Sequence, residues 1–334
     1  MIESKQLDLF DDVRDKDISS IDRLFRDVKK YRNSSEFQKK LDFYCGFPYL
    51  GVYNAALVEQ QRPGARLVLT TDKWLKLFNR KIRSNARPVI ILMPFYPVEF
   101  LFDIADTRSI DNNVKVNEDI IIERIIKHYS AKSTHDVGFY YENMMKNLPK
   151  QGICYNHEYI TGSELQAEIR EDLSEKVFVQ INKDYLEEHH SYFTISVSMR
   201  ANHTEQLASI FHELGHLFCR HIQCQWWRGR SYTKETKEFE AEVVSYLVCK
   251  RLGIETNSVR YLSCYLEENA QIPPILIDFV FQAVDIIEQM AKGNIDVTKC
   301  LLYKKDSSFK AKVDRIKEKI REEKEKKKAA KEQF

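Results

Sequence analysis

The chain has 334 residues, of which 43% are hydrophobic and 12% aromatic, so it can bury a large core. Its polar start lacks the basic and apolar segments of a secretion signal, and no uncharged apolar run reaches the roughly 18 residues of a membrane span. Seven cysteines without a CxxC pair indicate reduced thiols. Composition therefore excludes a disordered or membrane-spanning chain and predicts a globular, cytoplasmic protein with no membrane partner.

The net charge of +2 is unevenly distributed, because residues 304–334 carry thirteen basic and seven acidic side chains. The body of the chain is therefore mildly acidic and its tail is basic.

Apolar spacing in the first third of the chain predicts a small α+β domain. The expected elements are helices over residues 19–45 and 54–61, a turn at 62–64, a strand over 67–69, a helix over 74–78, and two strands within 88–102 that are split by a turn at 93–97. Residues 106–117 are polar and are expected to link this part to the next.

A basic segment lies within this first part, with eight cations against one acid, Asp72. The cations are Arg62, Arg66, Lys73, Lys76, Arg80, Lys81, Arg83 and Arg87. Trp74 lies among them, and Phe95 and Tyr96 follow. Cations that contact phosphates and aromatic rings that stack on bases would form a single-stranded nucleic-acid site. The alternative is that the rings belong to the core and the charges form a solvated face.

Several segments of this part form a recognisable set: Tyr53 to Leu57, Gln61 to Ala65, Trp74, Asn85 to Ile91 and Asp103 to Thr107. Together they resemble the N-terminal domain of ArdC-type antirestriction proteins. The resemblance covers about residues 20–107 and implies a fold that binds single-stranded DNA.

The second part is also expected to be α+β. Its expected elements are helices over 118–129 and 138–147, then strands over 153–160, 177–181 and 192–199. In the last strand Phe193, Ile195 and Val197 alternate with Ser and Thr, which predicts one buried and one polar face. As an edge strand it would hold an extended peptide by main-chain hydrogen bonds, and the alternative is an ordinary half-buried strand.

His212, Glu213 and His216 form the motif HExxH on a predicted helix that begins at a capping box of Asn202 and Glu205. Residues four apart share a helix face, so the two histidines can bind one ion with Glu213 beside it. Catalytic zinc takes three protein ligands and a water, which a nearby carboxylate deprotonates. The alternatives are a chance pair of histidines or a zinc ion that only supports the fold.

A third ligand is expected from the next predicted helix, residues 237–247. His221 would lie about 140° around a continuing helix from His216, which disfavours it. Glu238 and Glu242 share a face, and their mutual repulsion would be relieved if Glu238 bound zinc while Glu242 held a ligand histidine from behind. The opposite assignment stays open. Between the two helices, residues 225–230 form an insert that either contacts substrate or packs as a loop.

These motifs together resemble the ImmA/IrrE-type zinc peptidases and, more closely, the peptidase domains of ArdC-like proteins. The residues that carry the resemblance are His212 to His216, Glu238, Glu240 to Glu242 and Val244 to Gly253. The resemblance covers about residues 150–270 and implies Glu238 as the third Zn2+ ligand. The chain differs from the family at Glu242, because members commonly have Asn at this position. The resemblance also implies a DNA-bound regulator or DNA-associated protein as substrate, in a mobile-element or stress-response setting.

The expected fold is α+β with four parts. They are an N-terminal tail over residues 1–18, an ArdC-like domain over 19–108, a gluzincin-like metallopeptidase domain over 109–290 that closes with helices over 261–268 and 275–290, and a basic C-terminal helix over 291–334. The expected function is zinc-dependent cleavage of a protein or peptide substrate. The rival is a single-stranded-DNA-binding antirestriction protein with a structural zinc, and a third possibility is an inactive scaffold.

Overall fold

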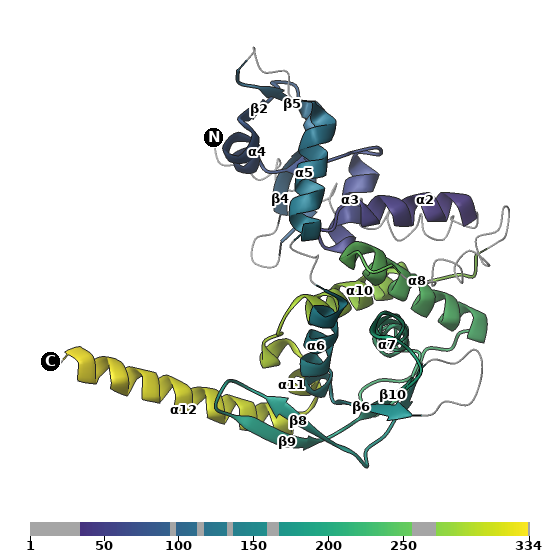
Figure 1. Ribbon diagram of the computed structural model, residues 1–334, viewed down its shortest axis with the longest axis vertical. Coiled ribbons are helices and arrows are strands. Elements are labelled where there is room, and N and C mark those ends of the chain that lie inside the picture. The colour runs from purple at the N-terminus through teal and green to yellow at the C-terminus, as the bar shows by residue number, and fades with distance from the viewer. Residues whose placement is uncertain are drawn as a thin grey trace, which may run out of the picture. The chain divides into compact units, whose positions relative to one another are not determined.

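The chain folds as an α+β protein with several small sheets, as expected (Figure 1). The computed structural model describes residues 34–93, 98–111, 117–131, 136–158, 167–255 and 272–332. The helices expected at 19–33 and 261–268, and the rings of Phe95 and Tyr96, lie outside these ranges. Two compact units emerge, one formed by residues 1–135 and 232–285, the other by residues 136–231 and 286–334.

The first unit combines helices with short antiparallel strands. Its elements are α2 (Ser34–Cys45), α3 (Val52–Gln61), β1 (Val68–Leu69), α4 (Thr71–Phe78), β2 (Arg80–Ile82), β3 (Val89–Leu92), β4 (Val98–Asp103), the 3-10 helix η1 (Ile104–Asp106), β5 (Thr107–Ser109), α5 (Glu118–Ala131), α8 (Lys234–Leu252) and the start of α10 (Ile277–Lys292). Strand β4 is central in the order β1-β4-β3, and β2 pairs with β5. The helices predicted at 54–61 and 74–78, the described part of the one predicted at 19–45, and the β3–β4 pair are confirmed, whereas the expected link at 106–117 contains β5.

The core of this unit forms around Trp74 on α4. Its ring is fully buried, and its Nε1–H donates to the carbonyl of Phe102, 2.8 Å away. Leu67, Leu69 and Ile104 pack in the same cluster. The local sequence supports this arrangement, because Thr70 caps the start of α4 and Asn79 ends it in the left-handed conformation.

Helix α8 packs with the N-terminal helices. The buried guanidinium of Arg251 donates to the carbonyls of Tyr44 (2.7 Å), Phe47 (3.3 Å) and Leu50 (2.6 Å). The hydroxyl of Tyr246 donates to Asp42 on α2, 3.0 Å away. These long-range bonds explain why the units are discontinuous in sequence, unlike the continuous domains expected at 19–108 and 109–290.

The second unit contains a three-stranded sheet, a hairpin and several helices. Its elements are α6 (Val137–Asn147), η2 (Pro149–Gln151), β6 (Ile153–Glu158), β7 (Ala167–Glu171), β8 (Lys176–Gln180), β9 (Leu186–His190), β10 (Phe193–Ser198), α7 (His203–Phe218), the end of α10, η3 (Val297–Lys299), α11 (Leu301–Lys305) and α12 (Ser307–Glu332). The sheet order is β6-β10-β7, and β8 pairs with β9. Helix α7 packs on both β7 and β10.

Strand β10 is the centre of its sheet, so its expected place at an edge is wrong. It runs parallel to β6 and antiparallel to β7, and all six of its residues are buried. The polar face of β10 can be buried because its hydroxyl groups form hydrogen bonds. Ser196 donates to Glu158 (2.7 Å) and Thr194 donates to Asp172 (3.3 Å). The edge strand next to α7 is β7, which the sequence did not reveal.

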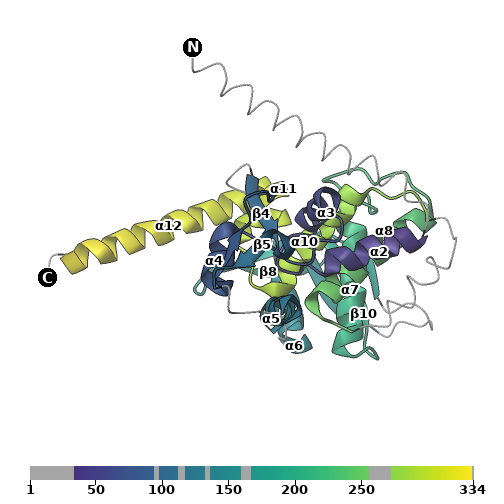
Figure 2. The same ribbon diagram turned by 90° about the horizontal axis from the view of Figure 1, so that it is seen from above.

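The C-terminal helix α12 begins against the β8–β9 hairpin. Phe309 and Val313 are buried with Val177 and Val179 of β8. Beyond this contact the helix is highly charged, and Figure 2 shows it continuing as one long rod. Within the described ranges, no helix combines the length and hydropathy that crossing a bilayer requires. The described cysteines are all free thiols, as expected.

Candidate metal centre

Helix α7 begins at the predicted capping box. The side chain of Asn202 accepts from the N–H groups of Thr204 and Glu205, and the Glu205 carboxylate accepts from the N–H of Asn202, all at 2.9–3.0 Å. Its apolar face is fully buried and includes Leu207, Ile210, Phe211, Leu214 and Leu217. That face fixes the rotation of the helix and leaves the three HExxH side chains partly exposed.

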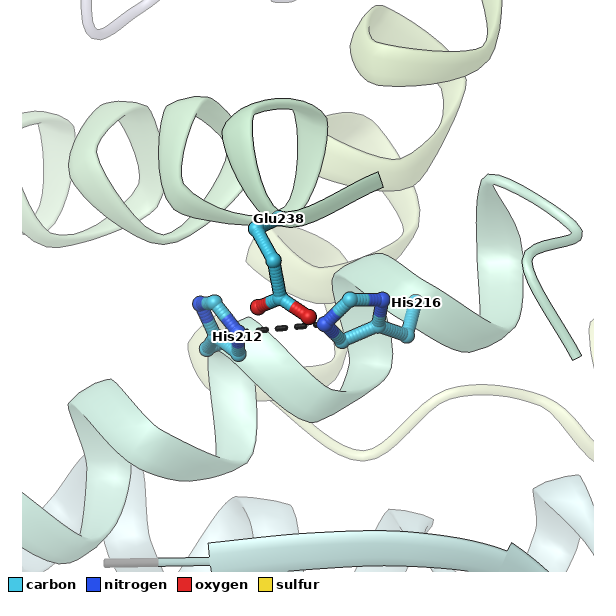
Figure 3. Close-up of side chains that lie close together, drawn as sticks. All are labelled: His212, His216 and Glu238. Carbon is cyan, nitrogen blue, oxygen red and sulfur yellow. Dashed lines mark hydrogen bonds between the residues drawn. The ribbon is translucent and has the colours of Figure 1, made fainter. Parts of the chain in front are cut away.

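The structure brings His212, His216 and Glu238 together. The Nε2 atoms of the two histidines are 3.1 Å apart, and the donor atoms of all three side chains lie within 4.8 Å of one another. In Figure 3 the carboxylate of Glu238, near the start of α8, points at both imidazole rings. The three residues expected to bind the metal therefore form one group.

This donor set fits zinc. Two imidazole nitrogens and one carboxylate are the ligands of a common catalytic zinc site. Zinc bound tetrahedrally at about 2.0–2.1 Å to both rings would hold the nitrogens about 3.3 Å apart, close to the 3.1 Å between His212 and His216. The residues present thus have both the chemistry and the spacing that the ion requires.

Glu213 directly follows His212 on α7 and contacts the edge of the sheet. Its Oε2 accepts from the backbone N–H of Ile169 on β7, 3.0 Å away. Ile169 faces Ile195 of β10 in the ladder. Glu213 is therefore held by β7, an edge strand that packs against α7, and this contact orients its carboxylate.

Glu242, the alternative ligand, is 7% exposed and is not a member of the group. Glu238 is thus the carboxylate that the geometry favours, while a role of Glu242 behind a ligand histidine stays a prediction.

A second group of donor atoms escapes the sequence reasoning. Cys219, His221 and Glu240 are all buried, and their donor atoms also lie within 4.8 Å of one another. The sequence disfavours His221 only if the helix continues past His216. Helix α7 instead ends at Phe218, and Arg220 adopts a left-handed conformation with φ +59°. The chain turns back there, so that Nδ1 of His221 lies 2.9 Å from Nδ1 of His216.

The insert between the two helices packs as a loop. Trp227 bridges to Cys224 and donates from Nε1 to the carbonyl of Ile222, 2.9 Å away. Trp226 lies against the ring of Tyr192, with centroids 4.2 Å apart. Arg230 donates to the carbonyl of Cys219 at the end of α7, 2.9 Å away.

The residues expected to contact nucleic acid divide into two sets. Trp74 is buried, so the expectation that it stacks on a base is wrong, and the core alternative holds for it. Arg62 pairs with Asp106 at 2.9 Å, and Arg66 pairs with Asp119. Buried Arg80 donates to Thr107 at 2.6 Å, and burial lowers the pKa of its guanidinium although Glu118 opposes this.

The second set keeps its charge at the surface. Its members are Lys73, Lys76, Lys81, Arg83 and Arg87. Arg83 also donates from Nε to the carbonyl of Thr107, 3.1 Å away. These exposed cations remain candidates for phosphate contacts, and so does Arg66, which is exposed although it pairs with Asp119.

A comparison with known proteins finds a relative in Bacillus anthracis, the uncharacterized protein pXO2-81. It is 24% identical over 286 residues, which is 75% of this chain and 47% of the relative. The chain thus spans about half the length of the relative that it matches. No family model and no solved structure matches the chain.

Proposed function

We propose that the chain is a zinc-dependent metalloendopeptidase that cleaves a protein or peptide substrate. The observation that carries the proposal is the grouping of the donor atoms of His212, His216 and Glu238. Glu213 directly follows His212 on the same helix. The resemblance to ImmA/IrrE-type and ArdC-like peptidases supports a gluzincin-like zincin architecture. It also favours a DNA-bound regulator or DNA-associated protein as the substrate, in a mobile-element or stress-response setting.

Each residue of the centre would have a distinct role. His212, His216 and Glu238 would hold the ion, which when bound acidifies a water molecule and polarises the scissile carbonyl. Glu213 would accept the proton of that water and pass it to the leaving amine. The N–H of Ile169 holds the Glu213 carboxylate in a fixed orientation, which favours proton transfer in one direction.

Strand β7 offers a track for the substrate. It ends the order β6-β10-β7, and an extended peptide can add to such an edge through main-chain hydrogen bonds. A peptide there would pass beside Ile169 and therefore beside Glu213. Strand β7 therefore takes the peptide-binding role that the sequence suggested for β10.

The decisive variant is Glu213→Gln, which keeps the size of the side chain and removes its basicity. We expect unchanged zinc content and a loss of peptide cleavage of about 100-fold or more. Zinc is measured by mass spectrometry of the purified protein. Cleavage is measured as new termini in a proteome-derived peptide library.

Glu205→Gln is the control for this measurement, because Glu205 lies on the same helix at the capping box. It should keep its cleavage activity. Zinc binding without any cleavage that distinguishes the native protein from Glu213→Gln would exclude the peptidase and leave a structural zinc.

A second candidate function is single-stranded DNA binding, favoured by the exposed cations of the first unit. Binding that neutralises phosphates weakens as salt rises, and each phosphate neutralised adds about 0.7 to the slope of log affinity against log salt. We expect the triple variant Lys73→Ala, Lys76→Ala, Lys81→Ala to bind a labelled poly(dT) strand more weakly and with a shallower slope.

The control for charge alone is Lys183→Ala with Lys234→Ala and Lys250→Ala, at exposed lysines of other segments. The hypothesis that this segment binds DNA would be contradicted if the native protein showed no salt-sensitive binding. It would also be contradicted if both triple variants lost affinity equally.

A further inference from the structure

The two ring nitrogens of His216 have different neighbours. Nε2 lies 3.1 Å from Nε2 of His212, and Nδ1 lies 2.9 Å from Nδ1 of His221. A neutral imidazole carries one N–H, so the nitrogen that binds a metal is bare and the other nitrogen must donate. With Nε2 facing the metal group, the proton of His216 belongs on Nδ1, where His221 is the acceptor.

The cap of α7 carries His221 to this position. The N–H of His221 donates to the carbonyl of His216 at 2.9 Å, and the N–H of Arg220 donates to the carbonyl of Leu217 at 3.0 Å. This pair of bonds is the Schellman arrangement, which commonly adds an apolar contact between the two residues joined by the outer bond. Here the two residues are His216 and His221, and their contact is a hydrogen bond between rings.

The backbone of this cap is strained. Arg220 has φ +59°, a left-handed conformation in which the Cβ of any residue other than glycine is crowded by its own backbone. Helix α8 ends in the same pair of bonds, but there the left-handed residue is Gly253 at φ +72°. A strained backbone conformation that a fold retains at one residue often indicates that this residue has a function.

His221 is 7% exposed, so its second nitrogen also needs a partner. If Nδ1 accepts from His216, the proton of His221 is on Nε2. The buried carboxylate of Glu240 belongs to the same group of donor atoms, and its Oε1 also accepts from the N–H of Leu276 at 2.7 Å. A hydrogen bond to this fixed carboxylate would stabilise the tautomer of His221 that carries its proton on Nε2.

We infer that His221 is a positioning residue of the metal centre: by accepting the Nδ1–H of His216, it fixes the tautomer and ring orientation with which Nε2 of His216 binds zinc. The inference rests on the proposed function, because it assigns a role around the same zinc site. Groups that hold a ligand histidine from behind typically contribute a factor of about 10–100 in metal affinity.

A matched pair of variants tests this role. Asn at position 221 would keep an acceptor at the distance of Nδ1, whereas Leu has nearly the same size and lacks an acceptor. We expect His221→Leu to lower zinc affinity about 10–100-fold and His221→Asn to keep most of it. Affinity is measured by competition with a chromophoric chelator. In the cobalt-substituted protein, the visible absorption bands should shift in His221→Leu alone.

Three further measurements separate the possible failures. Arg220→Gly relieves the backbone without touching either ring and should leave zinc affinity unchanged. Circular dichroism shows whether His221→Leu is folded, and the comparison with His221→Asn removes effects of packing. The native protein and Cys219→Ala should each bind one equivalent of zinc.

Equal zinc affinity in His221→Leu, His221→Asn and native protein would overturn the positioning role while the proposed peptidase stands. Two equivalents of zinc in native protein, falling to one in Cys219→Ala, would overturn it differently, because His221 would then be a ligand of a second ion. A native protein that binds no zinc would overturn the proposed function and this inference together.

Discussion

Three carboxylates on one helix have unlike surroundings. On α8, Glu238 is partly exposed and grouped with the two histidines of the HExxH motif. Glu240 is fully buried and accepts from the backbone of Leu276. Glu242 is 7% exposed and lies one turn after Glu238. Spacing alone could not decide whether Glu238 or Glu242 is the ligand. In the structure, Glu238 points at the two histidines, whereas Glu242 is not a member of their cluster of donor atoms.

We expect Glu238→Ala to lose zinc far more completely than Glu242→Ala. Glu238 would supply a direct bond to the ion, whereas Glu242 acting through a histidine would contribute a factor of about 10–100 in affinity. Chelator competition on both purified variants measures the difference. Loss of zinc in Glu242→Ala alone would reverse the assignment.

Among the elements, those with a strong apolar period were predictable and those stabilised by polar partners were not. Helix α7 and strand β10 could be read from apolar spacing alone. Strand β9, with the sequence Leu-Glu-Glu-His-His, shows no such alternation and has polar partners elsewhere in the chain, including the contact of His189 with Asp306 at 3.0 Å. Of the candidate site, His212, Glu213 and His216 could be predicted because one helix carries them, whereas His221 depends on how that helix ends.

Asp306 joins two elements, the β8–β9 hairpin and α12. Its carboxylate accepts from the hydroxyl of Tyr192, from the N–H of Phe309 (2.9 Å) and pairs with His189 (3.0 Å). Burial alone would raise the pKa of Asp306, but the hydrogen bonds from Tyr192, Phe309 and His189 outweigh it, so the pKa is lowered. A lowered folded-state pKa stabilises the fold above the unfolded-state pKa, about 3.9, and this stabilisation is lost as the pH falls through the folded value.

Asp306→Asn should therefore lower the free energy of unfolding by about 1 kcal/mol at neutral pH, because Asn removes the charge and has one acceptor oxygen where the carboxylate has two. The difference from native protein should shrink as the pH falls below about 4. Urea unfolding at a series of pH values measures it. Asp184→Asn, at an exposed carboxylate of the hairpin loop, is the control and should change stability little at any pH. A difference for Asp306→Asn that stays constant into acid would contradict the titration argument.

For the whole molecule, the notable feature is that each unit is assembled from two separate stretches of chain. The first unit needs α8 because Arg251 satisfies the carbonyls of Tyr44, Phe47 and Leu50 at the end of α2 and beyond it. No local pattern could have predicted this, because the three acceptors are backbone atoms and the donor lies about two hundred residues away. The expected fold class was right at the level of α+β, while the grouping of the elements depended on such distant contacts.

Arg251→Met should destabilise the first unit by about 2–4 kcal/mol, because three buried carbonyls lose a charged donor. Native-state hydrogen exchange should show faster exchange in α2 and α8, with little change in the sheet of β6, β7 and β10. Lys250→Met, at the exposed neighbouring position, is the matched control. Equal acceleration in both units would mean that the chain unfolds as one cooperative body.

The order β6-β10-β7 also determines when this sheet can form. The central strand is the last of the three to leave the ribosome, so β6 and β7 have no partner in the sheet until residues 193–198 are available. The parallel pairing of β6 with β10 closes a loop of about forty residues, a non-local contact of the kind that slows folding. Strand β7, which contacts Glu213, therefore gains its partner in the sheet only when residues 193–198 are made, just before the HExxH helix. A growing chain would thus acquire the two histidines of the HExxH motif and the strand edge that contacts Glu213 almost at the same moment.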